Sequence, residues 1–149
     1  MKRHELVTTA LLLLTACGGS SPEPLPDLNP AMGGTWTGSS TVTPQGYAPS
    51  TVASQLDVAV AGTSATISAV CPDGSGTLVA TGSGNNAAWA GTLACPPLAV
   101  APCPSVVARL TSANGTLSSD GLTLTVQALG TATGCATTLG VTMVFVGSK

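Results

Sequence analysis

The sequence predicts an all-β fold, a single antiparallel up-and-down β-barrel of about eight strands. The first observation is that apolar and polar residues alternate with a period of two over Leu122–Gln127 and Leu139–Phe145, as in a strand with one buried face. The second is that residues typical of tight turns separate the segments of this kind. The third is that no stretch carries a convincing helical stripe. Together these observations favour strands that are joined by short connections.

The predicted strands and the turns between them follow one another along the chain. In order, the strands are Thr35–Thr43, Thr51–Val60, Ser64–Cys71, Thr77–Ser83, Ala87–Ala94, Val106–Leu117, Leu122–Gln127 and Leu139–Phe145. Residue pairs that tolerate the positive φ of hairpin turns stand between several of them, at Gly62-Thr63, Asp73-Gly74, Asn85-Asn86 and Asp120-Gly121. Asn114-Gly115 lies inside the sixth segment and predicts a bulge or turn there.

Closure of these strands into one barrel is the economical arrangement for a domain of about 115 residues. Eight strands can pair in a ring and leave no exposed sheet edge, which would otherwise invite aggregation. A β-sandwich of two sheets is the alternative, because counting strands does not separate the two architectures.

The N-terminus has the composition of an export leader. Basic residues at Met1–Arg3 precede an apolar run at Leu6–Leu14, which is too short for a membrane span because a spanning helix needs about 20 apolar residues. The motif Leu14-Thr15-Ala16-Cys17 resembles the lipobox of bacterial lipoproteins at every position. The resemblance implies that residues 1–16 are a signal peptide and that Cys17 becomes the lipidated first residue. Secretory cleavage without lipidation is the competing interpretation.

The same resemblance implies a location and a layout for the mature chain. Gly18 follows Cys17 where an aspartate holds many lipoproteins at the inner membrane, so the outer membrane is favoured, with the protein facing the periplasm or the cell surface. The three fatty chains expected at Cys17 would anchor it firmly. Residues 17–33 are rich in proline, glycine and serine and predict a tether. Residues 34–149 form the predicted barrel domain.

A second resemblance lies where the first predicted strand begins. Gly34-Thr35-Trp36 resembles the Gly-x-Trp signature with which lipocalins and their calycin relatives begin. The resemblance implies a small barrel in which Trp36 plugs one end, covered by an arginine from the last strand. Arg109 is the only arginine after the leader, and it lies in a middle strand.

Four cysteines remain after the leader and Cys17, namely Cys71, Cys95, Cys103 and Cys135. An even number of cysteines in an exported chain predicts disulfides, here two. If the strands alternate up and down, all four cysteines meet at one rim, and the preferred pairing is Cys71 with Cys95 and Cys103 with Cys135. Two other pairings stay open. We expect no metal site, because there is no C-x-x-C pair and the only histidine, His4, lies in the leader.

The charge and composition of the mature chain argue against two classes of function, nucleic-acid binding and catalysis. The mature chain has two basic and five acidic side chains, a net charge of −3, which cannot provide the clustered positive charge that nucleic acids require. We expect no enzyme, because the mature chain has no histidine to act as a base and Asp57, Asp73 and Asp120 are scattered. Nothing in the sequence calls for a cofactor.

Two functions remain after these exclusions. The first is a lipid-anchored envelope lipoprotein with a packed barrel, which has a structural or protein-interaction role and meets the membrane only through the lipid on Cys17. The alternative is a lipocalin-like carrier of a small apolar ligand inside the barrel. An eight-stranded barrel can be filled by side chains or hold one small molecule. The packed barrel is favoured because we expect these residues to fill one side of the interior: Leu122, Leu124, Val126, Leu139, Val141, Met143 and Phe145.

Overall fold

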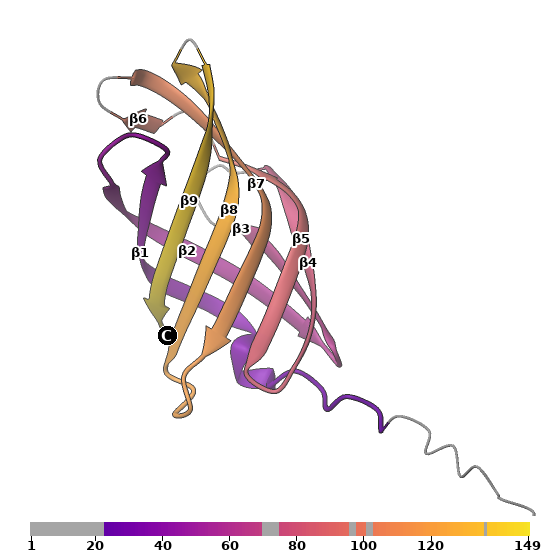
Figure 1. Ribbon diagram of the computed structural model, residues 1–149. Coiled ribbons are helices and arrows are strands. Elements are labelled where there is room, and N and C mark those ends of the chain that lie inside the picture. Colours follow the sequence, from indigo (N-terminus) through magenta and orange to yellow (C-terminus); the bar gives the residue numbers. More distant parts are fainter. Residues whose placement is uncertain (1–22, 70–74, 96–97, 101–102, 136) are drawn as a thin grey trace, which may run out of the picture.

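The computed structural model describes residues 23–69, 75–95, 98–100, 103–135 and 137–149 (Figure 1). Cys17 and the leader lie outside these ranges, as do Cys71 and Asp73. One short 3₁₀-helix, Pro30–Met32, precedes the strands. The strands are β1 (Gly34–Pro44), β2 (Ser50–Ala61), β3 (Ser64–Ala69), β4 (Ser75–Ser83), β5 (Asn86–Ala94), β6 (Leu98–Val100), β7 (Cys103–Leu117), β8 (Thr123–Cys135) and β9 (Thr137–Ser148). Among the described residues, no helix is long and apolar enough to cross a membrane.

Eight of the strands close into one antiparallel barrel. Each strand of the wall pairs with its neighbour in sequence, except that β5 pairs with β7 and β1 pairs with β9. These two long-range pairings join the sheet into a ring, so the predicted closed barrel is confirmed and the sandwich alternative is wrong. Strand β6 was not predicted; in the part of the chain that the structure describes it pairs with β7 alone and lies outside the ring.

The chain enters the barrel at one end, which we call the tether end and define by residues 27–33. The backbone N–H of Leu28 donates to the Gly62 carbonyl, and that of Asn29 donates to the Gly84 carbonyl. The side chains of Leu28 and Met32 are fully buried. The expected tether, 17–33, therefore ends earlier than predicted, because its last residues belong to the folded domain.

The opposite end of the barrel, the rim, carries the connections between β1 and β2 and between β8 and β9 (Figure 1). The hairpins β2–β3, β4–β5 and β7–β8 turn at the tether end, where β9 also ends (Figure 1). Short hairpins that alternate between two ends are what an up-and-down order requires. Residues 27–33 therefore dock at the end of the barrel that lies opposite the rim.

The barrel interior holds the large apolar side chains. Alternate residues of each strand point inward, and the largest fully buried side chains are Trp36, Phe145, Leu28, Met32, Leu56, Ile67, Leu78, Leu93, Leu110, Leu117 and Leu124. Glycines make room for the aromatic rings: a Cβ added at Gly115 would lie 2.3 Å from the Trp89 ring, and one at Gly147 would lie 2.3 Å from the Phe145 ring. The interior therefore depends on small residues as much as on large ones.

Two local predictions are wrong. Leu122 does not point inward; it precedes β8 in the turn and is 63% exposed. Asn114-Gly115 forms no bulge or turn, since both residues keep regular pairing with β5 and β8. The irregularity in β7 lies instead at Thr111, where the pairing with β8 shifts between Leu110 and Ser112. Space for the Trp89 ring, rather than a turn, explains the glycine at position 115.

Candidate functional site

Trp36 lies at the tether end of the barrel, beside the point where the chain enters. Its ring is fully buried, and its Nε1 donates a hydrogen bond of 2.9 Å to the Met32 carbonyl. Lys149, which follows β9, holds its Nζ 4.5 Å from the centre of the Trp36 ring. The same ammonium donates hydrogen bonds to the carbonyls of Ala31 and Gly33. A cation that follows the last strand thus covers the tryptophan and ties it to the entering segment.

Lys149 is a residue that the sequence analysis did not assign to this end. The resemblance to lipocalins directed attention to an arginine, and Arg109 lies on the outside of β7, with an exposed side chain. A lysine can make the same kind of contact with an aromatic face. The signal in the sequence was a lone basic residue four positions beyond the last predicted strand.

The cysteines lie toward the rim as far as the structure describes them. Cys95 follows β5, is 4% exposed and is disulfide-bonded. Its backbone N–H donates a hydrogen bond of 2.9 Å to the Ala108 carbonyl of β7. The side chains of Cys103 and Cys135 lie outside the described part, as does Cys71, so the preferred pairing stays a prediction. Ser75 pairs with Ala94, which brings the start of β4 beside the end of β5.

Asp57 and Asp120 are held in separate hydrogen-bonded positions. The carboxylate of Asp57 on β2 accepts a hydrogen bond of 2.7 Å from the Thr35 hydroxyl. Asp120 lies in the β7–β8 turn, where the Ser118 hydroxyl and then the Leu122 N–H donate to its carboxylate and hold its pKa below the ordinary value of 3.8. Among the described residues, no three His, Cys, Asp or Glu side chains gather as a metal site would require. These carboxylates stabilise strands and turns.

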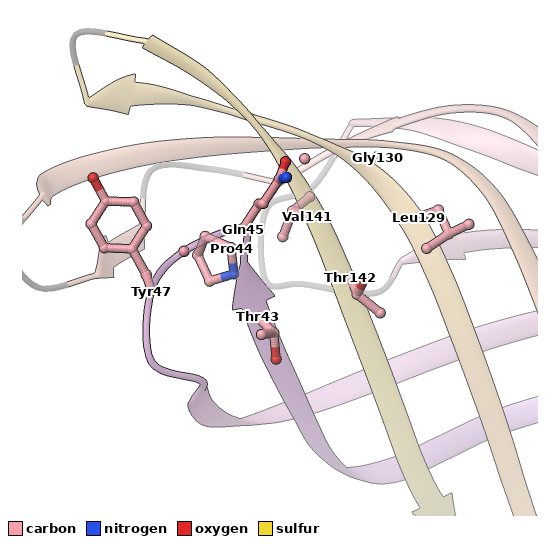
Figure 2. Close-up of a pocket in the computed structure, with 10 residues that line it drawn as sticks. Thr43, Pro44, Gln45, Tyr47, Leu129, Gly130, Val141 and Thr142 are labelled. Atoms are coloured by element: carbon pink, nitrogen blue, oxygen red, sulfur yellow. The ribbon is translucent and has the colours of Figure 1, made fainter.

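A groove crosses the outer surface near the rim, and we call it the rim groove (Figure 2). It has a volume of about 430 Å³. Its lining comes from the end of β1 and the loop after it, from β8 and from β9: Thr43, Pro44, Gln45, Gly46, Tyr47, Leu129, Gly130, Gly140, Val141 and Thr142. Figure 2 shows Tyr47 and Leu129 at opposite ends of the row of labelled side chains, with Gln45, Thr43 and Thr142 between them. No pattern in the sequence predicted a groove at these residues.

Strand pairing assembles the rim groove from distant parts of the sequence. Pro44 pairs with Val141, and the Gln45 N–H donates 2.8 Å to the Gly140 carbonyl. The Tyr47 N–H donates back to the Pro44 carbonyl, which turns the loop over the end of β1. Gly130 allows β8 to lie close to β7, since a Cβ at this position would lie 2.1 Å from the Arg109 carbonyl oxygen. The groove is therefore fixed on one side by sheet pairing and on the other by a turn.

The indole nitrogen of Trp89 is a polar atom buried inside the barrel. Trp89 of β5 is 2% exposed, and its Nε1 has no hydrogen-bond partner among the residues that the structure describes. Buried polar groups are normally paired, and an unpaired one costs free energy unless water or a ligand satisfies it. Trp89 is thus a buried donor available to an acceptor inside the barrel.

The fold and these sites define a small closed β-barrel with a lysine-covered tryptophan at one end and an uncharged groove near the other. No protein-family model, curated protein or solved structure matches the chain.

Proposed function

We propose that the chain is a lipid-anchored envelope lipoprotein of the bacterial outer membrane, whose packed barrel has a non-enzymatic, structural or protein-interaction role. The observation that supports this proposal is the burial of large apolar side chains inside the barrel. Three aromatic rings, Trp36, Trp89 and Phe145, are buried within one small barrel together with leucines of five strands and the docked N-terminal segment. With the interior occupied by side chains, the outer surface is the part that can meet a partner.

The direction of the chain supports the anchored arrangement. Residues 27–33 dock at the tether end. The loop between β1 and β2, which helps to line the rim groove, lies at the opposite end (Figure 1). A lipid on Cys17 would hold the tether end toward the membrane. The rim would then project outward, where an envelope partner can reach it.

Metabolic labelling tests the anchor. Cells that express the protein are fed an alkyne analogue of palmitate, and the purified protein is examined for label beside the Cys17→Ser variant. We expect label and retention in the outer-membrane fraction for the unaltered protein, and neither for Cys17→Ser, because the thiol that carries the diacylglycerol is gone. An unlabelled, freely soluble unaltered protein would contradict the proposal.

A second candidate function, a carrier for a small apolar ligand, is favoured by the unpaired Nε1 of Trp89. A bound ligand with one acceptor could satisfy this donor inside the apolar barrel. Titration with a fatty acid tests the idea, with Trp89→Phe as the variant that keeps an aromatic ring but lacks the donor. Saturable binding that weakens in Trp89→Phe would favour the carrier, and no binding would favour the packed barrel.

A further inference from the structure

We infer that the rim groove is a binding site for a neutral saccharide. This goes beyond the proposed function and depends only on the folded domain. Three properties of the groove support it: hydrogen-bonding side chains that the protein leaves unused, apolar surfaces at both ends, and the absence of charge from its lining.

The polar side chains of the groove are unused by the protein. The side chains of Thr43, Gln45, Tyr47 and Thr142 make no hydrogen bond to any other residue that the structure describes. One turn of alternation away on β1, the Thr41 hydroxyl is already paired with that of Thr51 on β2, at 2.9 Å. Hydroxyl and amide groups both donate and accept, as sugar hydroxyls do. The groove thus offers several unoccupied partners of the kind that a saccharide needs.

Apolar surface flanks these polar groups. Tyr47 is half-buried at one end of the groove, and Leu129 is 50% exposed at the other. An aromatic ring with a polar tip can pack against the C–H face of a sugar while its hydroxyl bonds to the edge. The volume of about 430 Å³ lies in the range of small-molecule sites, roughly 300–1,000 Å³.

The lining also argues against other occupants. None of its ten residues is charged, so an ionic ligand would lose hydration without gaining a counter-charge. A peptide that adds a strand needs a free sheet edge. Within the groove β1 pairs with β9 at Thr43 and Thr142, and Thr142 also faces Leu129 of β8, so these edges are already used. A neutral ligand bound through side chains is what remains.

Binding is tested by two-dimensional NMR on the mature chain from Gly18 to Lys149, exported to an oxidising periplasm. The probes are maltoheptaose, cellohexaose and a chitin hexamer, with a neutral serine–threonine peptide for comparison. We expect saturable shifts with at least one saccharide at concentrations up to about 10 mM. The shifts should affect the amides of Gly46, Tyr47, Gly130 and Gly140 and should not affect those of Ser83 and Asn86, which line a separate groove.

Variants distinguish saccharide binding in the rim groove from nonspecific binding elsewhere on the protein. Tyr47→Ala should weaken binding by about fivefold to tenfold, because it removes the stacking surface. Tyr47→Phe should keep most of the affinity, and Thr81→Ala in the separate groove should leave it unchanged. Tyr47 follows β1 in a loop, and the amide spectrum of each variant reports directly whether the barrel is intact.

Several results would overturn the inference. They are no saturable shift with any of the three saccharides, shifts that survive Tyr47→Ala, or binding of the peptide in place of the saccharides. The proposed function has a separate test, since loss of palmitate labelling would leave this site standing and failure of saccharide binding would leave the anchor standing.

Discussion

At the scale of single residues, the contact between Lys149 and Trp36 does the most to fix the tether end. One ammonium covers the tryptophan ring and also binds two carbonyls of the entering segment. Trp36 in turn donates to Met32 in that segment. The segment, the first strand and the residue after the last strand are thus joined by one small group of polar contacts around an apolar ring.

Replacement of Lys149 tests this arrangement. Lys149→Met keeps the length of the side chain and removes the charge and the donors, so we expect the free energy of unfolding to fall by about 1–2 kcal/mol. Lys149→Arg should recover much of this loss because a guanidinium can also lie over the ring. Urea denaturation of the three proteins measures the difference. Equal midpoints for all three would show that the contact contributes nothing.

Asp120 gives a pH-dependent prediction at the same scale. Its folded-state pKa is lowered by the Ser118 hydroxyl and then by the Leu122 N–H. A lowered pKa means that the carboxylate contributes stability above its ordinary value of 3.8, and that this contribution is lost as the pH falls from 3.8 toward the lowered pKa. Ser118→Ala should raise the pKa, as followed by NMR titration of the carboxyl carbon. An unchanged titration curve in Ser118→Ala would refute the assignment of cause.

At the scale of elements, β5 and β7 fit together because a glycine faces a tryptophan. A Cβ at Gly115 would lie 2.3 Å from the Trp89 ring, so Gly115→Ala must displace that ring. We expect overpacking to cost about 1–3 kcal/mol. The double variant Gly115→Ala with Trp89→Leu should recover part of the loss. Thermal unfolding measures both, with Gly140→Ala as the control because a Cβ there would meet only the Gln45 side chain, at 3.4 Å. A Gly115→Ala protein as stable as the original would contradict this packing.

Strands were predictable from the sequence because alternation is a local property. Each of the eight predicted strands overlaps one wall strand, from Thr35–Thr43 within β1 to Leu139–Phe145 within β9. Strand β6 escaped prediction, since three residues among prolines are too short to show alternation. Leu122 was misplaced because alternation alone does not mark where a strand begins, and the turn around Asp120 extends through it.

The candidate site was less predictable than the strands. The rim groove needs the pairing of β1 with β9, which joins the two ends of the domain, and a period-two pattern does not say which strands pair. Gln45 and Tyr47 occupy a loop whose residues show no pattern in the sequence. Trp36 was assigned in advance because a short motif marked it, whereas Lys149 had no such motif.

At the scale of the whole molecule, we expect disulfides near the rim to stabilise the barrel. Cys95 is disulfide-bonded. We expect peptide mapping without reduction to give the pairs Cys71 with Cys95 and Cys103 with Cys135, and reduction to cost about 3 kcal/mol per bridge. Linked peptides in either of the other two pairings would refute the preferred connectivity, and an unchanged melting temperature after reduction would refute the stabilising role.

Native mass spectrometry tests the central claim, a packed barrel that acts through its outer surface, most directly. The mature chain from Gly18, exported to an oxidising periplasm, is weighed under native conditions and again after denaturation. We expect the native and the denatured mass to be equal, because on our proposal side chains rather than a ligand fill the interior. An excess native mass that disappears on denaturation would mean that the barrel carries a ligand, and would contradict the packed interior.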